Sequence, residues 1–446
     1  MRPFLPQKTL VFLACVATLV VSGCASFSDK DQPKLEGQRL DVTLQPTLLQ
    51  PNPAALLEAF ALPQPTAMAN WAQPGANASH TPGHISLGQK VVRAWSYSLG
   101  GGVGRGSALL NPPVVHSGRV FAVNTRGEVV ALNAANGKEI WSVELPLATQ
   151  SARDITGGIA VTGNLLFVTT GAGQVFALTA TSGKKVWDVN LNVPLRAAPT
   201  VAGETVFVTS HDNRTFALSA LNGGLLWTHS GIEENLSLLA AGAPAADNGA
   251  VAVPYSSGEI YVLRASDGRY IWHDTLSSPF SGQDPEMTLA TIAAPPVIAD
   301  GLVYVVGMNG GLTAYGLVNG QRFWRSDITT SQLPIVAGAH IFALTEKGEL
   351  VAMNRRDGAI RWVVDAGKGL PTTDEKRLWV GPVLAGGRLI VASSDGYAVS
   401  LNPENGKQIA ATRIDDSITL PPIVADGTLY FLTDSGRLIA FRPAGT

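Results

Sequence analysis

The stretch that decides the fold is residues 131–141, ALNAANGKEIW, because the chain repeats it. Six further segments align with it without gaps: ALTATSGKKVW (177–187), ALSALNGGLLW (217–227), VLRASDGRYIW (262–272), AYGLVNGQRFW (314–324), AMNRRDGAIRW (352–362) and SLNPENGKQIA (400–410). In each segment but the last, a Trp stands four residues after a Gly, and consecutive Trp residues are 38 to 52 positions apart. A period of this size is typical of repeat architectures such as propellers.

A second set of positions supports the same period. Four residues before each segment stands a Gly or an Asn, the residues that adopt positive φ at least cost: Gly127, Gly173, Asn213, Gly258, Gly310, Gly348 and Gly396. An alternating apolar stretch such as 119–123 precedes this position, and a short stretch that begins with Pro, such as 113–115, precedes that in turn. Four strands in each repeat of about 40–45 residues predict a β-propeller blade.

The two ends of the repeat region are incomplete in complementary ways. Residues 422–441 repeat the first three strands of a blade, and no strand with a Trp follows them. Residues 91–98, VVRAWSYS, look like a fourth strand without the first three. We therefore predict an all-β fold: an eight-bladed β-propeller over residues 91–446, closed by the N-terminal strand, which completes the last blade. Each Trp is expected to wedge between neighbouring blades; the alternative role is an aromatic cage for a ligand.

Composition limits the class of protein. Hydrophobic residues make up 46% of the chain and charged residues 15%, which excludes disorder over most of its length. The formal net charge is −2, so the basic surface that nucleic-acid binding needs is not indicated. Only two cysteines are present, Cys15 and Cys24. A WD-repeat propeller is disfavoured because Gly-His and Trp-Asp pairs are absent, and an α/β barrel because no helical period separates the strands.

The N-terminus has the pattern of a targeting signal. Basic residues Arg2 and Lys8 precede an apolar run, and Val21-Ser22-Gly23-Cys24 follows it. This motif resembles the lipobox of bacterial lipoproteins, which implies cleavage of residues 1–23 and a lipid on Cys24; a short transmembrane anchor is the alternative. Ala25, in place of an Asp, implies sorting to the outer membrane. Residues 24–90 are rich in Pro and are expected to form an extended periplasmic tether.

The pattern of 131–141 resembles the tryptophan-docking repeat of pyrroloquinoline-quinone (PQQ) dehydrogenases. Together, the lipobox, the Pro-rich segment and eight such blades resemble the assembly-factor lipoproteins of the outer-membrane β-barrel assembly machinery. This resemblance implies a non-enzymatic scaffold that is anchored by lipid in the outer membrane, on its periplasmic side, without a cofactor. It implies docking on a POTRA domain of the barrel-forming subunit, and it leaves open whether nascent outer-membrane proteins bind directly.

The resemblance also implies partner-binding residues. Val193, Leu195 and Arg196 occupy the apolar, apolar and basic positions of a family docking loop. An exposed aliphatic pair beside an Arg would make a credible hot spot. The alternative is that Val193 and Leu195 begin a buried strand. A second family contact uses acidic residues, but this chain has Thr291 and Ala293 there, with Asp284 and Glu286 further upstream.

Two other classes of function stay open at this stage. A PQQ-dependent dehydrogenase or quinone-binding protein would share the repeat, but no Cys lies in the propeller for the vicinal disulfide of those enzymes. We assign no catalytic, cofactor-binding or metal-binding residue, because the acidic residues are scattered and the histidines lack metal-ligand spacing: His80, His84, His116, His211, His229, His273 and His340. A sugar-binding propeller would need an aromatic-lined face, which sequence alone does not locate.

Overall fold

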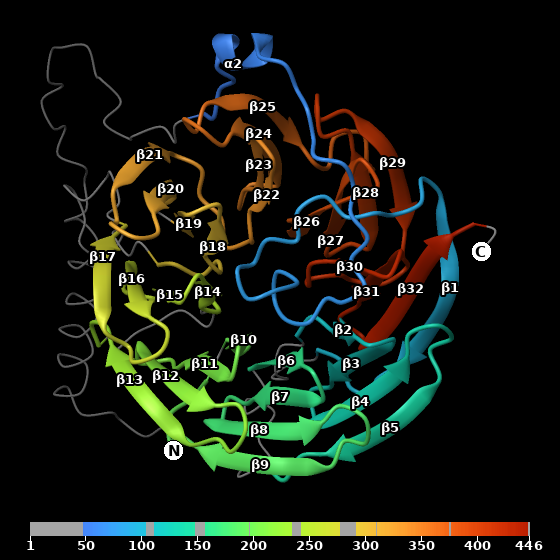
Figure 1. Cartoon of the computed structure of the whole chain (residues 1–446). Helices are drawn as coiled ribbons and strands as arrows, with labels where there is room; N and C mark the ends of the chain where they lie inside the picture. The colour runs from blue at the N-terminus through green and yellow to red at the C-terminus, as the bar shows by residue number, and fades with distance from the viewer. Residues whose placement is uncertain are drawn as a thin grey trace, which may run out of the picture. The chain divides into compact units, whose positions relative to one another are not determined.

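The described residues form a ring of eight antiparallel sheets, each of four strands (Figure 1). The structure is a computed structural model, and it describes residues 48–103, 111–147, 157–195, 197–233, 242–276, 291–308, 310–373 and 376–444. The predicted signal peptide, 1–23, and the predicted lipid site, Cys24, lie outside these ranges. Among the described residues, no helix has the length and apolar character needed to cross a membrane.

Blades 1 to 4 follow one another along the chain, each with its strands in sequence order from the centre outward. The strands are β2 (Val114–His116), β3 (Arg119–Val123), β4 (Glu128–Asn133) and β5 (Glu139–Glu144); β6 (Gly158–Thr162), β7 (Leu165–Thr169), β8 (Gln174–Thr179) and β9 (Lys185–Asn190); β10 (Thr200–Ala202), β11 (Thr205–Thr209), β12 (Arg214–Ser219) and β13 (Leu225–Ser230); and β14 (Ala245–Asp247), β15 (Ala250–Pro254), β16 (Glu259–Arg264) and β17 (Tyr270–Thr275).

Blades 5 to 7 repeat this order, and blade 8 joins the two ends of the propeller. The strands are β18 (Val297–Ala299), β19 (Leu302–Gly307), β20 (Gly311–Gly316) and β21 (Arg322–Ser326); β22 (Ile335–Ala337), β23 (His340–Leu344), β24 (Glu349–Asn354) and β25 (Ile360–Asp365); β26 (Trp379–Ala385), β27 (Arg388–Ser393), β28 (Tyr397–Leu401) and β29 (Gln408–Arg413); and β30 (Ile423–Ala425), β31 (Thr428–Leu432), β32 (Arg437–Pro443) and β1 (Val91–Ser98).

Strand β1 closes the ring as the sequence predicts. It pairs antiparallel with β32, and Trp95 lies opposite Ala440, the same pairing that Trp141 makes with Ala131 inside blade 1. In Figure 1, the blue strand β1 lies beside the red strand β32. Blade 8 therefore combines the two ends of the propeller sequence and leaves no open radial seam.

The Trp residues join neighbouring blades through one repeated contact, which is made at seven junctions of the ring. The indole of Trp272 is 6% exposed, and its Nε1–H donates to the Leu317 carbonyl of blade 5 at 2.8 Å. A Cβ on Gly320, which has φ +66°, would lie 2.7 Å from the same ring. Two features therefore require a Gly at this position of the motif: the positive φ, and the neighbouring indole, which leaves no room for a Cβ. Six other Trp residues donate in the same way: Trp95, Trp141, Trp187, Trp227, Trp324 and Trp362.

The missing Trp of the seventh repeat has a structural reason. Each docking indole packs on the turn between the third and fourth strands of the next blade. Blade 8 has no such turn, because β32 and β1 come from opposite ends of the propeller. Ala410 therefore has no turn to dock on.

One local prediction is wrong: in blade 5, Gly311 and not Gly310 has the positive φ of the hairpin position.

Residues 48–90 are not the free tether that the sequence predicts. They cluster with the propeller, and Trp71, His80 and Ile85 are buried. We call residues 63–89 the axial segment, because it runs along the inner strands around the centre of the ring, where Figure 1 shows its blue trace. The rest of the predicted tether, 24–47, lies outside the described residues.

The axial segment contacts the blades in their order around the ring. Its hydrogen bonds join Met68 to Asp426 of blade 8 (2.7 Å), Trp71 to Val115 of blade 1 (2.8 Å), Ala72 to Val161 of blade 2 (2.8 Å), Gln73 to Val201 of blade 3 (2.7 and 3.2 Å), Ala78 to Ala246 of blade 4 (2.7 Å), Ser79 to Ile298 of blade 5 (2.9 Å), and Ile85 to Leu384 and Gly386 at blade 7 (3.0 and 2.8 Å). Inner strands would otherwise expose unpaired peptide groups toward the axis. The segment satisfies these groups and fills the centre of the ring.

His80 gives the axial segment a measurable pH dependence. Burial lowers the pKa of His80 from 6.5 to about 4, although its Nδ1, 2.8 Å from the Pro296 carbonyl, donates a hydrogen bond that opposes the shift. Below pH 6.5 the His80 side chain is protonated in the unfolded chain but stays neutral in the folded chain. The free energy of unfolding is therefore highest above pH 6.5 and decreases as the pH falls to 4.

The expected loss from His80 is about 3 kcal/mol of unfolding free energy between pH 6.5 and pH 4. The measurement is urea unfolding of the wild type and of His80→Asn across this pH range; Asn is chosen because it tolerates the φ of +58° at this position. The variant should show a shallower decline than the wild type. Equal slopes for the two proteins would contradict the assignment.

Candidate functional site

The antiparallel strand order divides the loops between two faces. Hairpins between the second and third strands, such as 210–213, share one face with the connections between blades, such as 191–199; we call it the loop face. Turns between the first and second strands and between the third and fourth, such as 355–359, share the other, which we call the turn face. The axial segment contacts the turn face, where Asn70 accepts from Ser117 N at 2.9 Å and His84 accepts from Gly387 N at 2.9 Å.

The predicted docking residues belong to the loop face. Val193 is 6% exposed and Leu195 0%, and both pack in the hydrophobic cluster between blades 2 and 3. The expectation of an exposed aliphatic pair is therefore wrong. The alternative is nearer to the structure, although Leu195 forms an isolated bridge with Ser210 rather than a strand. Arg196 lies outside the described residues.

The reason for this burial is the tight connection between blades 2 and 3. Asn192 has φ +57°, which turns the chain directly after β9, and a Cβ on Gly173 would lie 2.6 Å from the Val193 carbonyl oxygen. The Pro194 carbonyl accepts from His211 N at 2.9 Å. Asn192 and Pro194 remain exposed at the surface of this loop. The loop is thus held from inside by Val193 and Leu195, and the residues that alternate with them face the solvent.

Sequence reasoning missed a polar group beside this loop. Arg214 pairs with Asp212 at 2.6 Å, and Ser210 Oγ donates to the same carboxylate at 2.5 Å. Burial raises the pKa of Asp212, but the hydrogen bonds from Arg214 and Ser210 and the charge of Arg214 outweigh it, so the pKa lies below its ordinary value. The signal in the sequence is the hairpin Ser-His-Asp-Asn-Arg at 210–214, which carries charge where the corresponding hairpin of blade 2 reads Thr-Gly-Ala-Gly-Gln.

The second family contact has no acidic residues at the matching positions. Thr291 and Ala293 are buried, at 2% and 6% exposed, and Asp284 and Glu286 lie outside the described residues. The part of the chain that the structure describes therefore supplies no carboxylate at the positions of this contact. The acidic half of the docking site stays without structural support.

The centre of the ring offers little for chemistry. The axial segment occupies it, and within the described ranges no three His, Cys, Asp or Glu side chains lie close enough together to hold a metal ion. The Nδ1 atom of His80 is hydrogen-bonded to a backbone carbonyl, and the residue itself belongs to the axial segment.

A row of aromatic rings lies between blades 3 and 4. Tyr261 stacks on His273 with ring centroids 5.0 Å apart, and the His229 ring lies 4.5 Å from Tyr261 with its plane tilted by 56°. His229 Nδ1 is 2.9 Å from the hydroxyl of buried Tyr255. Of these pairs, only Tyr261–His273 and His229–Tyr255 have nearly parallel planes, at 12° and 5°.

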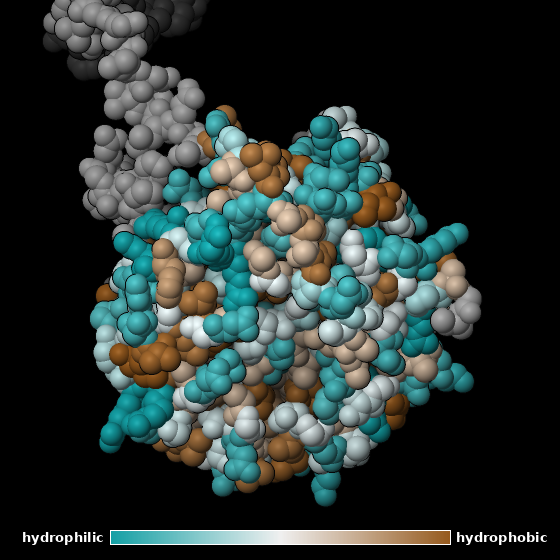
Figure 2. Space-filling model, turned by 45° about the horizontal axis from the view of Figure 1, so that its top comes forward, coloured by the Kyte–Doolittle hydropathy of each residue, from teal (hydrophilic) through white to brown (hydrophobic). Residues whose placement is uncertain are grey.

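Exposed apolar side chains lie on the outer strands. Those beside the docking Trp positions include Val186, Leu225, Leu226, Tyr270, Ile271 and Phe323. On the face that Figure 2 displays, hydrophobic residues form separate small groups among hydrophilic ones. The outer strands of the blades thus combine unpaired edges with scattered apolar side chains.

The repeated Trp contact, the closure by β1 and the eight sheets define a class: eight-bladed propellers with tryptophan-docking, PQQ-like repeats. Residues 88–152, 125–364 and 365–445 match the family model described as outer membrane protein assembly factor BamB. The chain belongs to this family. The matched residues begin at 88, so most of the axial segment precedes them.

Individual relatives agree with the family match. The chain is 32% identical over 351 residues to the outer membrane protein assembly factor BamB of Salmonella typhimurium, covering 78% of this chain and 87% of the relative. It is 31% identical over 352 residues to that of Escherichia coli K12, covering 77% and 87%. The predicted resemblance to assembly factors is confirmed.

Solved structures place the fold. Crystalline BamB from Moraxella catarrhalis superposes with a TM-score of 0.67 at 21% identity, over 79% of this chain and 100% of that one. Quinohemoprotein alcohol dehydrogenase from Comamonas testosteroni gives a TM-score of 0.63 at 14% identity, over 85% and 82%. At such identities the likeness concerns the fold alone, so the dehydrogenase does not bring its activity to this chain.

Proposed function

We propose that the protein is a non-enzymatic scaffold of the outer-membrane β-barrel assembly machinery. The observation that carries the proposal is the match to assembly factors over residues 88–445, which include the whole propeller. A lipid on Cys24 would hold the chain at the periplasmic side of the outer membrane. The partner is a POTRA domain of the barrel-forming subunit.

A binding role also fits the geometry better than a catalytic one. The axial segment takes the central position in which a propeller would otherwise hold a small ligand. What the molecule offers instead is a rigid ring with loops on one face. The function we propose is therefore presentation and bracing of other proteins.

The docking site we propose is the loop face around the connection 191–199. Here Val193 and Leu195 act as internal supports of the loop, and Arg196 is the residue that contacts the partner. Asp212 and Arg214, on the neighbouring hairpin, add a charged pair at the same face. Arg is favoured in such places because its guanidinium forms bidentate contacts with carboxylates.

Nascent barrel strands would meet a different part of the molecule. The outer strands leave one edge unpaired, and an extended peptide can add to such an edge. Leu225 and Leu226 on β13, and Tyr270 and Ile271 on β17, place exposed apolar side chains there. We therefore assign the rim to clients and the loop face to the barrel-forming subunit.

The docking proposal predicts the effect of reversing one charge. Arg196→Glu should weaken binding to the isolated POTRA region about 30-fold, the effect of losing a hot spot worth roughly 2 kcal/mol. Binding would be measured by surface plasmon resonance. Leu195→Ala is unsuitable, because loss of a fully buried Leu side chain destabilises the loop itself.

The matched control is Arg269→Glu. Arg269 is 79% exposed in the turn between β16 and β17, on the turn face. This control should bind like the wild type. If Arg196→Glu, with an unchanged melting temperature, bound as tightly as the control, the docking site would be placed wrongly.

A further inference from the structure

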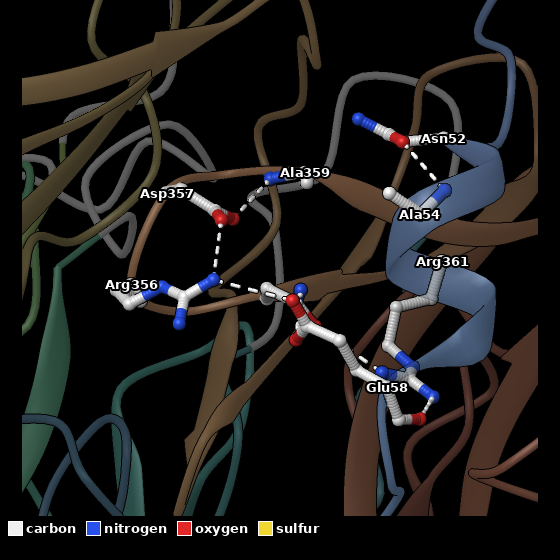
Figure 3. Close-up of polar contacts among 8 residues, drawn as sticks. Asn52, Ala54, Glu58, Arg356, Asp357, Ala359 and Arg361 are labelled. Carbon is white, nitrogen blue, oxygen red and sulfur yellow. Dashed lines mark hydrogen bonds and ion pairs between the residues drawn. The ribbon is translucent and has the colours of Figure 1, made fainter.

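Residues 52–62 form a strap across blade 6 on the turn face. It begins with helix α2 (Pro53–Leu57), which Asn52 caps by accepting from Ala54 N at 2.9 Å, and continues as an extended segment toward the axis. Figure 3 shows the strap beside Arg361 of β25 and residues of the turn that precedes β25. We call Asn354, Arg356, Arg361 and His340 the clamp.

The clamp binds Glu58 through both its side chain and its backbone. The carboxylate accepts from Asn354 Nδ2 at 2.8 Å and pairs with Arg356 at 3.2 Å. The Glu58 carbonyl accepts from the Arg361 guanidinium at 2.8 Å. A site that contacts a carboxylate and the following peptide group together recognises an acidic residue in an extended chain.

Phe60, two residues further on, fills the second half of the clamp. Its ring stacks on His340 with centroids 4.3 Å apart and planes 17° apart, and the Arg361 guanidinium lies 5.6 Å from the ring centre. Arg361 is only 4% exposed, and its Nε is buried without a hydrogen-bond partner among the described residues. Its other nitrogens donate to the Asn354 side chain at 3.4 Å and to the Glu58 carbonyl, so the strap supplies the shorter of these hydrogen bonds and the aromatic contact.

The other contacts of the strap lie at its two ends: Asn52 N donates to the Ile360 carbonyl at 2.7 Å, and Leu62 packs against the hydrophobic cluster of blades 6 and 7. A helix of five residues is not stable on its own, and within it only Ala55 is buried. Leu56 is 53% exposed and Leu57 is 88% exposed. The clamp side is rigid, because its residues belong to β23, β25 and the end and turn of β24. The arrangement is therefore a short peptide whose middle part is held in a preformed site by one acidic residue and one aromatic ring.

Beside Glu58 lies an open cavity of about 320 Å³, lined by Leu302, Ala339, His340, Asn354, Arg355 and Arg356. Arg355 is already fully engaged with Tyr304, Asp300 and the Ala299 carbonyl. The cavity gives a longer or bulkier segment than the strap room to bind.

We propose that the clamp is a peptide-recognition site for a carboxylate followed two residues later by an aromatic ring, and that the strap occupies it in cis. The occupant we assign is an extended segment of a partner protein with this acidic-x-aromatic pattern. Charge complementarity supports this choice. Without Glu58, Arg356 keeps Asp357 as its carboxylate partner, and the buried Arg361 keeps the amide oxygen of Asn354. The site lies on the opposite face from the proposed POTRA docking site, so it is independent of that proposal.

A tethered strap competes strongly, because a short linker gives it an effective concentration near the millimolar range. The test therefore uses the full chain carrying Glu58→Ala and Phe60→Ala, which keeps the strap but removes its two anchors. A fluorescein-labelled peptide, NPAALLEAFAL (the sequence of residues 52–62), is titrated with this variant and with the wild type, and binding is read by fluorescence anisotropy.

The variant should bind the peptide at least tenfold more tightly than the wild type. Adding Arg356→Glu should remove that gain, whereas Arg322→Glu on the outer strand of blade 5 should not. A peptide with Gln for the Glu and Ala for the Phe should bind at least tenfold more weakly. If the double variant has a lower melting temperature than the wild type, the single variant Glu58→Gln is used in its place.

Two results would overturn the proposal. The first is equal peptide affinity of the variant and the wild type. The second is a dimer of the wild-type chain in sedimentation experiments that Arg356→Glu dissociates, because the occupant would then be the strap of a second copy rather than a partner segment.

Discussion

A chain that lacks residues 48–87 should lose about 6 kcal/mol of unfolding free energy relative to the full chain. Trp71, Ile85 and Leu87 are buried in the cluster that joins blades 7, 8 and 1, and burial of such side chains contributes roughly 1.5–3 kcal/mol each. Loss of the axial hydrogen bonds leaves peptide groups of the inner strands without partners and adds to this cost. Urea unfolding followed by tryptophan fluorescence measures the difference.

Rescue in trans separates a specific role from general loss of mass. A synthetic peptide of residues 60–89 should restore part of the stability of the shortened chain, in proportion to its concentration. The same peptide with Ala in place of Trp71 and Gln73 should restore less, because it loses the buried Trp71 ring and the side-chain hydrogen bonds of Gln73 to blade 3. A shortened chain that unfolds at the same urea concentration as the full chain would show that the axial segment is not part of the folded unit.

The second large effect is expected at the contact between blades 4 and 5. Trp272→Ala should destabilise the protein by about 3–5 kcal/mol, because it removes a buried indole and leaves the Leu317 carbonyl without its donor. The measurement is again urea unfolding, with circular dichroism confirming that the variant is still a propeller in water.

Blade 7 provides the matched control. Ala410→Trp should change stability by less than about 0.5 kcal/mol, since blade 8 offers no turn for the new ring to dock on. A strong gain at position 410 would contradict the explanation given for the missing Trp. A loss below 1 kcal/mol at Trp272 would contradict the locking role of the indoles.

Much of the propeller follows from sequence because its information is local and repeated. The spacing of Gly320 and Trp272, and of the equivalent pairs, reflects one contact between neighbouring blades, so each copy confirms the others. The closure by β1 follows from counting strands at the two ends. Gly310 was misassigned by one residue because two glycines stand side by side there, and either could take the positive φ.

The axial segment could not be predicted in the same way. Its contacts use single side chains, such as Gln73 on Val201 and His80 on Pro296, and they involve partners more than 100 residues away. It has no period, and its prolines are typical of linkers. The sequence of such a segment therefore predicts a tether, and only the three-dimensional structure of the propeller reveals its contacts.

The candidate docking residues show a similar limit. The pattern of Val193, Leu195 and Arg196 reveals that a loop is apolar and basic, but not which of its side chains face inward. That depends on the neighbouring hairpin, where Ser210 bridges to Leu195.

The clamp was missed because Glu58 and Arg361 are far apart in the chain and meet only through the strap.

Hydrogen–deuterium exchange of the complex with the POTRA region tests the central claim most directly. Docking through the loop face predicts slower exchange in residues 191–199 and 210–214, and unchanged exchange in the strap and the axial segment. Slower exchange confined to the turn face, or none in the loops between blades 2 and 3, would contradict the account.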